Sequence, residues 1–312
     1  MMTAARLEWI AADPASGRML EIAGKVAATS TTVLITGESG TGKDHLARWI
    51  HEQSPRRDAA FLKIDCASLP SELVESELFG HERGAFTGAE ARKPGRLELA
   101  RDGTIVLDEV AALAPSIQSK LLRVLEEHKF ERLGGTETLD MDSRLIALTN
   151  ADLERAVRGG YFREDLFFRL NVVVILVPPL RERPKDIRPL AENFLARLAP
   201  VHGRTDAVMD PAAIGALEAY SWPGNVRELK NVIEHALIFA KTSMLKRDDF
   251  PAILNAGDAV LPAANPRSLE DLEKEAIIAT LDATHYKIAQ AAGILGISRK
   301  TLLEKRKKYG LT

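Results

Sequence analysis

Short apolar runs recur along the first part of the chain, each about as long as a buried β-strand. We expect strands at residues 32–36, 61–65, 104–107, 145–149 and 172–177. Segments with helical periodicity separate these runs, and parallel strands need such crossovers. The pattern therefore predicts an α/β unit built on a parallel five-stranded sheet.

The strand signals stop at Pro178 and Pro179, and a helical period takes over at 186–198, 211–220 and 225–240. These segments predict a small helical lid. The stretch 255–266 is rich in Ala, Pro, Gly and Asn and shows neither period, which indicates a linker. We divide the chain into an α/β unit at 1–178, a lid at 179–254, a linker at 255–267 and an all-helical C-terminal unit at 268–312.

With 312 residues, 46% of them hydrophobic and 28% charged, the chain has the composition of an ordinary globular protein. Its formal net charge of −2 argues against a generally basic nucleic-acid coat, so DNA binding needs a local basic patch. The single cysteine, Cys66, is expected to be an inert buried thiol. No apolar run reaches the roughly 18 residues that span a bilayer, and residues 1–8 lack the apolar core of a signal peptide. We therefore expect a cytoplasmic protein.

A glycine-rich loop follows the first predicted strand and precedes a helical stretch. In a P-loop of this spacing, backbone N–H groups and the helix N-terminus face phosphates, and a lysine neutralises their charge. A structural glycine-rich turn is the alternative. Asp44 stands where the general P-loop has Ser or Thr for Mg²⁺, so we expect its carboxylate to turn away from the phosphates or to act through water and the metal. The predicted nucleotide site comprises Gly37, Glu38, Ser39, Gly40, Thr41, Gly42, Lys43 and Asp44.

Two carboxylates, Asp108 and Glu109, follow the apolar run 104–107. The carboxyl edge of a parallel sheet is where such groups meet a phosphate site. Asp108 is therefore the predicted Mg²⁺ ligand, and Glu109 the predicted polariser of the water that attacks ATP. Two solvated surface carboxylates are the alternative.

Between these two motifs lies a hexapeptide of small residues with one aromatic side chain. Its glycines permit a tight tip, and an exposed Phe needs a partner. A core anchor within its own domain is the alternative for this Phe. The hexapeptide consists of Gly84, Ala85, Phe86, Thr87, Gly88 and Ala89.

Together, the P-loop, the acidic strand end and the hexapeptide resemble the central domain of sigma-54-dependent transcriptional activators, over most of the chain. That resemblance implies an AAA+ ATPase, with ATP and Mg²⁺ as cofactors, that forms a homo-oligomeric and hexameric ring. It also implies that the hexapeptide contacts sigma-54. The segment 131–136 resembles a second loop that moves with the first.

Further positions take roles from the same resemblance. Asn150 matches sensor I, Arg227 matches sensor II in the lid, and Arg163 and Arg169 match arginine fingers offered to a neighbouring subunit. The alternatives are a turn asparagine, a surface arginine on the lid, and local ion pairs of the fingers with Glu164 or Asp165.

Two segments depart from the family pattern. Asp65 stands where the family has an asparagine switch that senses the catalytic glutamate. A carboxylate facing Glu109 would repel it unless one group is protonated or a cation lies between them. The segment 11–17 also differs, which leaves the adenine contacts open.

The end of the chain carries a helix-turn-helix signal, a small-residue helix followed by a glycine turn and a serine cap. From 298 to 312 there are six basic residues against one acidic residue. This unit resembles the Fis-type domain of sigma-54 activators, and a solvated basic helix is the alternative. The predicted DNA contacts are Ser298, Arg299, Lys300, Thr301 and Lys305.

The leading hypothesis is an ATP-dependent activator that binds double-stranded DNA and remodels closed complexes of sigma-54 and RNA polymerase. A DNA-binding repressor with residual ATPase activity and an AAA+ remodeller of another target are the alternatives. The P-loop begins at Gly37, so we expect no sensory domain before it. Regulation would then come from a trans-acting partner, from expression level or from a region outside this chain.

Overall fold

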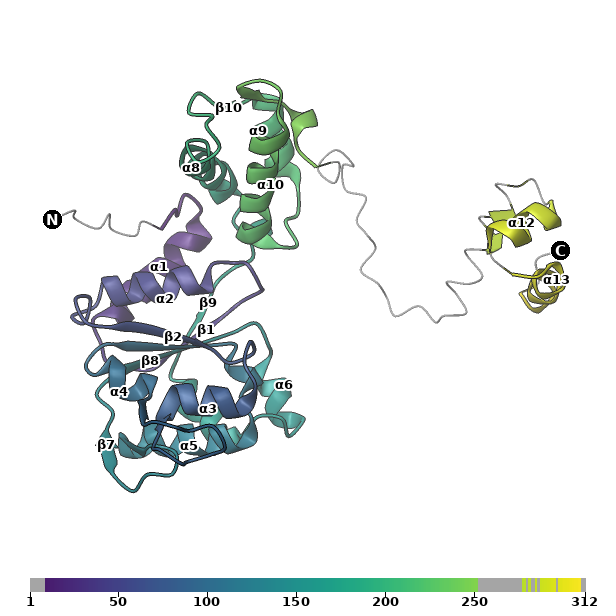
Figure 1. Cartoon of the computed structure of the whole chain (residues 1–312). Helices are drawn as coiled ribbons and strands as arrows, with labels where there is room; N and C mark the ends of the chain where they lie inside the picture. Colours follow the sequence, from purple (N-terminus) through teal and green to yellow (C-terminus); the bar gives the residue numbers. More distant parts are fainter. Residues whose placement is uncertain are drawn as a thin grey trace. The chain divides into compact units, whose positions relative to one another are not determined.

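The computed structural model describes residues 9–251 and 277–309, the second range with gaps at 279, 282–283, 285–286 and 296 (Figure 1). The chain divides into two compact units, Met1–Gly257 and Asp258–Thr312, and each is described by itself. The linker predicted at 255–267 lies outside the described residues.

The first unit is built on one parallel sheet with the strand order β2-β5-β8-β1-β9. Its strands are β1 (Val33–Thr36), β2 (Phe61–Asp65), β5 (Thr104–Asp108), β8 (Arg144–Thr149) and β9 (Val173–Leu176). The central strands are buried on both faces, which explains why they read as unbroken apolar runs. The predicted five-stranded sheet is confirmed.

Helices cover both faces of this sheet (Figure 1). On one face, α1 (Pro14–Ala27) and α2 (Lys43–Glu52) bury Met19, Leu46 and Ile50 against β1 and β9. The other face packs against α3 (Ser71–Phe79), α4 (Arg96–Ala100), α5 (Pro115–Glu127) and α7 (Glu164–Leu170). The short helix α6 (Leu153–Arg158) follows β8. Cys66 is buried, as expected, and burial raises the pKa of its thiol to about 12.

Two short hairpins extend from the sheet and were not predicted. One pairs β3 (Gly80–His81) with β4 (Lys93–Pro94), and the other pairs β6 (Lys129–Glu131) with β7 (Thr138–Asp140). The first hairpin encloses the hexapeptide 84–89, and the second encloses most of the segment 131–136.

The predicted lid is also confirmed. It contains α8 (Ile187–Leu198), α9 (Pro211–Ala219) and α10 (Asn225–Phe239), with a short parallel pair of β10 (Val208–Met209) and β11 (Met244–Leu245). Its core centres on Trp222, which is fully buried and donates a hydrogen bond to the Leu217 carbonyl.

The second unit has a small core of its own. Helices α12 (Ile288–Ile294) and α13 (Arg299–Lys308) pack around Ala291, Ala292 and Leu302. None of the helices in the described part of the chain is both long and apolar enough to cross a membrane.

Candidate functional site

The glycine-rich loop leaves the end of β1 and enters α2 at Lys43. Gly40 and Gly42 have φ values of +78° and +104°, a region that favours glycine. A Cβ atom on Gly40 would lie 2.4 Å from the carbonyl oxygen of Gly224 in the lid, so the backbones of the P-loop and the lid turn approach each other closely here.

Lys43 is folded back into this loop. Its Nζ donates to the carbonyl oxygens of Gly37 at 2.8 Å and Glu38 at 3.1 Å. Burial lowers the pKa of this ammonium, and nearby carboxylates, Glu109 first among them, oppose the shift. The ammonium therefore lies where phosphate oxygens could replace the two carbonyls as its partners.

Asp44 and Asp108 share one cationic partner that the sequence did not reveal. The Nζ of Lys63, on β2, lies 2.7 Å from Asp108 Oδ2 and also contacts Asp44 Oδ1. Burial alone would lower the pKa of Lys63, but its bonds to Asp108 and Asp44 outweigh burial and raise that pKa. The structure thus directs the carboxylate of Asp44 to Lys63.

Glu109 and Asn150 are brought together at the carboxyl edge of the sheet. Glu109 has φ +52°, its Oε2 accepts from the backbone N–H of Asn150 at 3.2 Å, and its own N–H donates to Asp108 Oδ1 at 3.0 Å. Asp65, expected to face Glu109, instead uses Oδ1 to accept the N–H groups of Ala67 and Ser68 in its own turn.

Arg227 of the lid contacts the P-loop. Its Nη1 donates to Ser39 Oγ at 2.8 Å, and its backbone N–H donates to the Gly40 carbonyl at 3.3 Å. The segment between sheet and lid adds two contacts that sequence reasoning missed. Arg181 makes a two-bond pair with Glu38 at 2.9 and 2.6 Å, and Arg183 donates to the Thr41 carbonyl at 2.6 Å.

Two hollows flank the P-loop. A cleft of about 730 Å³ is lined by Glu38, Ser39, Asn150 and Arg227, among others. A smaller cavity of about 170 Å³, on the side of α8, is bounded by Trp9, Gly42, His45, Arg183 and Phe194, among others. The ring of Trp9 lies 5.1 Å from the ring of His45, and the guanidinium of Arg183 lies 5.8 Å from the Trp9 ring. Trp9, which lies just before the segment 11–17, was not identified from the sequence.

The two arginines predicted as fingers make their described contacts away from the P-loop. Arg163 pairs with both carboxylate oxygens of Asp165 at 3.0 and 2.7 Å, which is the local ion pair weighed as the alternative. Arg169 donates to the carbonyl oxygen of Leu125 at 3.1 and 2.7 Å. Both arginines are exposed, at the start and near the end of α7.

The hexapeptide forms a closed turn, with Gly84 N–H bonded to the Ala89 carbonyl at 2.8 Å. Phe86 is 42% exposed and rests edge-on against the His81 ring, with ring centres 5.0 Å apart. His81 is itself bonded through Nδ1 to Ser76 Oγ at 2.8 Å. Phe86 is therefore a half-exposed side chain on a polar support and not a core anchor.

The segment 131–136 is hydrogen-bonded directly to the base of the hexapeptide 84–89. Leu133 exchanges backbone hydrogen bonds of 3.0 Å with Gly80 and Glu82, at the base of the hexapeptide. Arg132 is buried and pairs with Glu82 at 2.8 Å and Glu98 at 2.9 Å. Movement of one loop must therefore disturb the other.

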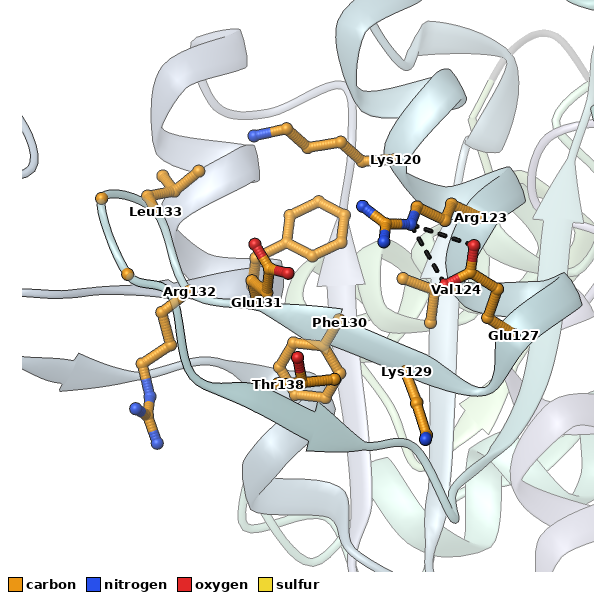
Figure 2. A pocket seen from close by; sticks show the side chains of 13 residues that line it. Lys120, Arg123, Val124, Glu127, Lys129, Phe130, Glu131, Arg132, Leu133 and Thr138 are labelled. Carbon is orange, nitrogen blue, oxygen red and sulfur yellow. Dashed lines mark hydrogen bonds and ion pairs between the residues drawn. The ribbon is translucent and has the colours of Figure 1, made fainter.

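A further cavity of about 260 Å³ lies between α5 and the hairpin of β6 and β7. Figure 2 shows Phe130, Lys120 and Arg123 around it, with Arg123 paired to Glu127. Its lining contains no P-loop residue, so it is separate from the nucleotide motifs.

In the second unit, Ser298 caps α13 by accepting from the Thr301 N–H at 3.1 Å. Leu302 is buried, while Arg299 and Lys300 are exposed and Lys305 is half-buried. The capped helix therefore presents its first basic residues outward, as a recognition helix does.

The parallel sheet, the P-loop, the acidic strand end and the lid arginine place the chain in the AAA+ class of folds. More narrowly, the chain belongs to the sigma-54 interaction domain family, whose family model matches residues 9–176. The AAA+ ATPase lid domain matches 181–266, and the bacterial regulatory protein, Fis family, matches 268–309.

Similar proteins are regulators. The regulatory protein AtoC of Escherichia coli K12 is 44% identical over 92% of this chain and 64% of its own length. A Nif-specific regulatory protein of Azospirillum lipoferum is 51% identical over 77% of this chain and 39% of its own length. The chain therefore spans only part of these curated relatives.

Solved structures of NtrX from Brucella abortus are also similar. Its complex with ADP has a TM-score of 0.75 at 37% identity, over 98% of this chain and 69% of the NtrX chain. Its complex with ATP has a TM-score of 0.74 at 36% identity, over 97% of this chain and 69% of the NtrX chain.

Proposed function

We propose that this chain is an ATP-dependent transcriptional activator of the cytoplasm that remodels closed complexes of sigma-54 and RNA polymerase. The observation that carries the proposal is the placement of the half-exposed Phe86 on a closed turn of the same α/β unit that holds the P-loop. Family membership and the regulatory relatives support it. In this proposal, the tip formed by Gly84, Ala85, Phe86, Thr87, Gly88 and Ala89 contacts sigma-54.

ATP is held in this proposal by the P-loop, from Gly37 to Lys43, with the adenine in the cavity beside Trp9. Phosphates replace the carbonyl partners of Lys43, and Arg227 reads their charge from the lid. The NtrX complexes with ATP and ADP support this assignment by analogy.

The acidic edge fits a divalent cation. Asp108 and Asp44 already converge on a single cationic atom, Lys63 Nζ, and carboxylate oxygens are the donors that Mg²⁺ takes. We assign Asp108 as the ligand, with Asp44 beside it. When bound, Mg²⁺ supplies positive charge to the phosphate oxygens.

Hydrolysis then depends on positioning. Glu109 polarises the water, and its contact with the Asn150 backbone fixes its carboxylate at the sheet edge. Asp65 is the candidate residue for relaying hydrolysis at Glu109 to the hexapeptide 84–89. Arg163 and Arg169 act on a neighbouring subunit's nucleotide in a homo-oligomer, proposed to be a hexameric ring.

DNA binding is assigned to the capped helix α13. Arg299 and Lys300 read base edges near its start, and Lys305 contacts phosphate. Ser298 and Thr301 hold the helix start in the geometry of their cap. The ligand is double-stranded DNA upstream of the promoter.

Replacing Phe86 by Ala tests the proposal. We expect sigma-54 binding in the presence of ADP and aluminium fluoride to weaken at least about 30-fold, because an aromatic anchor contributes roughly 2 kcal/mol or more. ATP hydrolysis should stay unchanged, because Phe86 bonds to none of the nucleotide motifs. Fluorescence anisotropy of labelled sigma-54 measures the complex.

Phe239→Ala is the matched control, since Phe239 is 64% exposed but lies in the lid. Loss of the complex in Phe86→Ala alone supports the activator. An active ATPase that forms no complex even as wild type would favour an AAA+ remodeller of another target.

Lys63→Met tests the acidic edge. Without its ammonium, Asp44 and Asp108 face each other unpaired, so the free energy of unfolding without metal should fall by about 1 kcal/mol, the pair being partly solvated. Magnesium should then raise the melting temperature of Lys63→Met more than that of wild type, since the ammonium no longer competes for Asp108. Scanning fluorimetry with and without magnesium measures both.

Lys25→Met is the control, because it removes an exposed pair with Glu21, 2.7 Å long, on α1. An equal response to magnesium in wild type and Lys63→Met would contradict the assignment of this edge.

A further inference from the structure

Asn225, the first residue of α10, has an unusual backbone and no exposed surface. Its φ is +54°, in the left-handed region, and its side chain is fully buried. Asparagine is one of the few residues other than glycine that tolerates this conformation. Its N–H donates to the Trp222 carbonyl at 2.8 Å, which closes the turn before the helix.

The amide of Asn225 joins three segments that are far apart in the sequence. Its Oδ1 accepts the Leu180 N–H at 2.8 Å, from the stretch after the sheet. Its Nδ2 donates to Glu38 Oε2 and to the Ser39 carbonyl, both at 3.1 Å. A buried polar group is costly unless it is bonded, so these contacts specify one arrangement of lid, connector and P-loop.

Glu38 is held from the other side by Arg181. Hydrogen bonding from Arg181 lowers the pKa of Glu38 to about 2, so this carboxylate is an anion at neutral pH. One of its oxygens, Oε2, is shared by Arg181 and the amide of Asn225. We call Glu38, Arg181 and Asn225 the latch.

The latch lies beside a close backbone contact between the lid and the P-loop. Gly40 leaves no room for a Cβ against the Gly224 carbonyl, and Arg227 follows Asn225 by only two residues. The guanidinium of Arg227 already touches Ser39 Oγ. Whatever fixes Asn225 on the P-loop therefore also fixes where Arg227 can reach.

We propose that Asn225 is a positioning residue for nucleotide binding: its amide fixes the lid on the P-loop and so places Arg227 at the phosphates. The role rests on the proposed ATP site and deepens it. Asn225 acts through the latch and Arg227, and does not itself touch the nucleotide.

Two substitutions separate the amide from the backbone. Asn225→Gly keeps the left-handed conformation without strain but removes all three side-chain bonds. Asn225→Asp keeps the size and the bond from Leu180 but sets a second carboxylate against Glu38. The double variant combines Glu38→Gln with Asn225→Asp. The amide introduced at position 38 can then donate to the carboxylate introduced at position 225, and this carboxylate stays near Arg181.

The measurement is the dissociation constant of a fluorescent ADP analogue for the full chain, with the melting temperature of each variant alongside. We expect Asn225→Gly to bind about tenfold more weakly, the equivalent of one buried hydrogen bond, and Asn225→Asp more weakly still. The double variant should return to within about threefold of Glu38→Gln alone, because coupled pairs are not additive. Asn171→Asp adds the same charge beyond α7 and should bind as wild type.

Wild-type affinity in both Asn225 variants would overturn the proposal. So would a fall in melting temperature with no rescue by Glu38→Gln, since that is the result of a purely structural role. Failure of the wild type itself to bind the analogue would overturn the proposed nucleotide site, and the latch with it.

Discussion

Replacing Glu109 by Gln should slow ATP hydrolysis about 10²- to 10⁴-fold, the range for loss of a group that handles a proton in the transition state. Nucleotide binding should be kept, because the bonds of Lys43, Arg227 and the P-loop do not involve this carboxylate. Gln preserves the length of the side chain and an oxygen that can accept the Asn150 N–H. The lost property is the negative charge that polarises water.

Steady-state phosphate release at saturating ATP, beside binding of a fluorescent ADP analogue, measures this result. Glu126→Gln is the control, since Glu126 is an exposed residue of α5. A Glu109→Gln protein that hydrolyses ATP at the wild-type rate would mean that another group activates the water. Weak nucleotide binding in the variant would instead indicate a role for Glu109 in the ground state.

The fold was predictable where burial is uniform. Strands β5 and β8 lie inside the sheet and are covered on both faces, so their sequences are continuous apolar runs. The edge strand β2 is only partly buried, yet its apolar start was enough to place it at its observed bounds. The hairpins of β3 with β4 and of β6 with β7 have strands of two or three residues, too short for any period. Their pairing depends on contacts such as Leu133 with Gly80, which local sequence does not encode.

The same distinction holds for the candidate site. The P-loop, Asp108 and Glu109 carry local signatures because strand, turn and helix follow one another in the chain. Arg181 and Asn225 do not, since they meet Glu38 across 143 and 187 residues. The role of Lys63 could not be predicted for another reason. The sequence of a predicted strand does not indicate which of its side chains will contact Asp44 and Asp108.

For Asp65, the resemblance to the family predicted the wrong surroundings, and the structure corrects them. A carboxylate in place of the family's asparagine predicted repulsion with Glu109. The described contacts of Asp65 are with its own turn, through the Ala67 and Ser68 N–H groups. A relay through Asp65 therefore requires this turn to open first, which makes the relay a conformational step.

Arg163 and Arg169 differ in their hydrogen-bond partners, and this difference favours one of them as the finger. Arg163 is in a two-bond ion pair with Asp165 on the same chain, whereas the bonds of Arg169 among the described residues go to a neutral backbone carbonyl, that of Leu125. Releasing Arg169 toward a phosphate costs less, because no charge is left unpaired behind it. Arg169 is therefore the better candidate for the arginine that acts in trans.

Arg169→Ala should lower ATP hydrolysis about 10³-fold or more, within the range for arginine fingers. The sharper test is mixing. Lys43→Ala subunits would bind nucleotide poorly but keep Arg169, whereas Arg169→Ala subunits keep the P-loop. In a mixed ring, the first kind should supply the arginine that the second kind lacks, so two inactive proteins together should hydrolyse ATP.

Arg158→Ala is the matched control, an exposed arginine of α6 that lies 3.8 Å from Glu154. If Arg169→Ala is inactive and mixing restores nothing, Arg169 acts within its own chain and the trans assignment is wrong. If Arg169→Ala is fully active while Arg163→Ala is not, Arg163 is the finger and its ion pair with Asp165 breaks on assembly. The neutral partner of Arg169 would then be no guide to the finger.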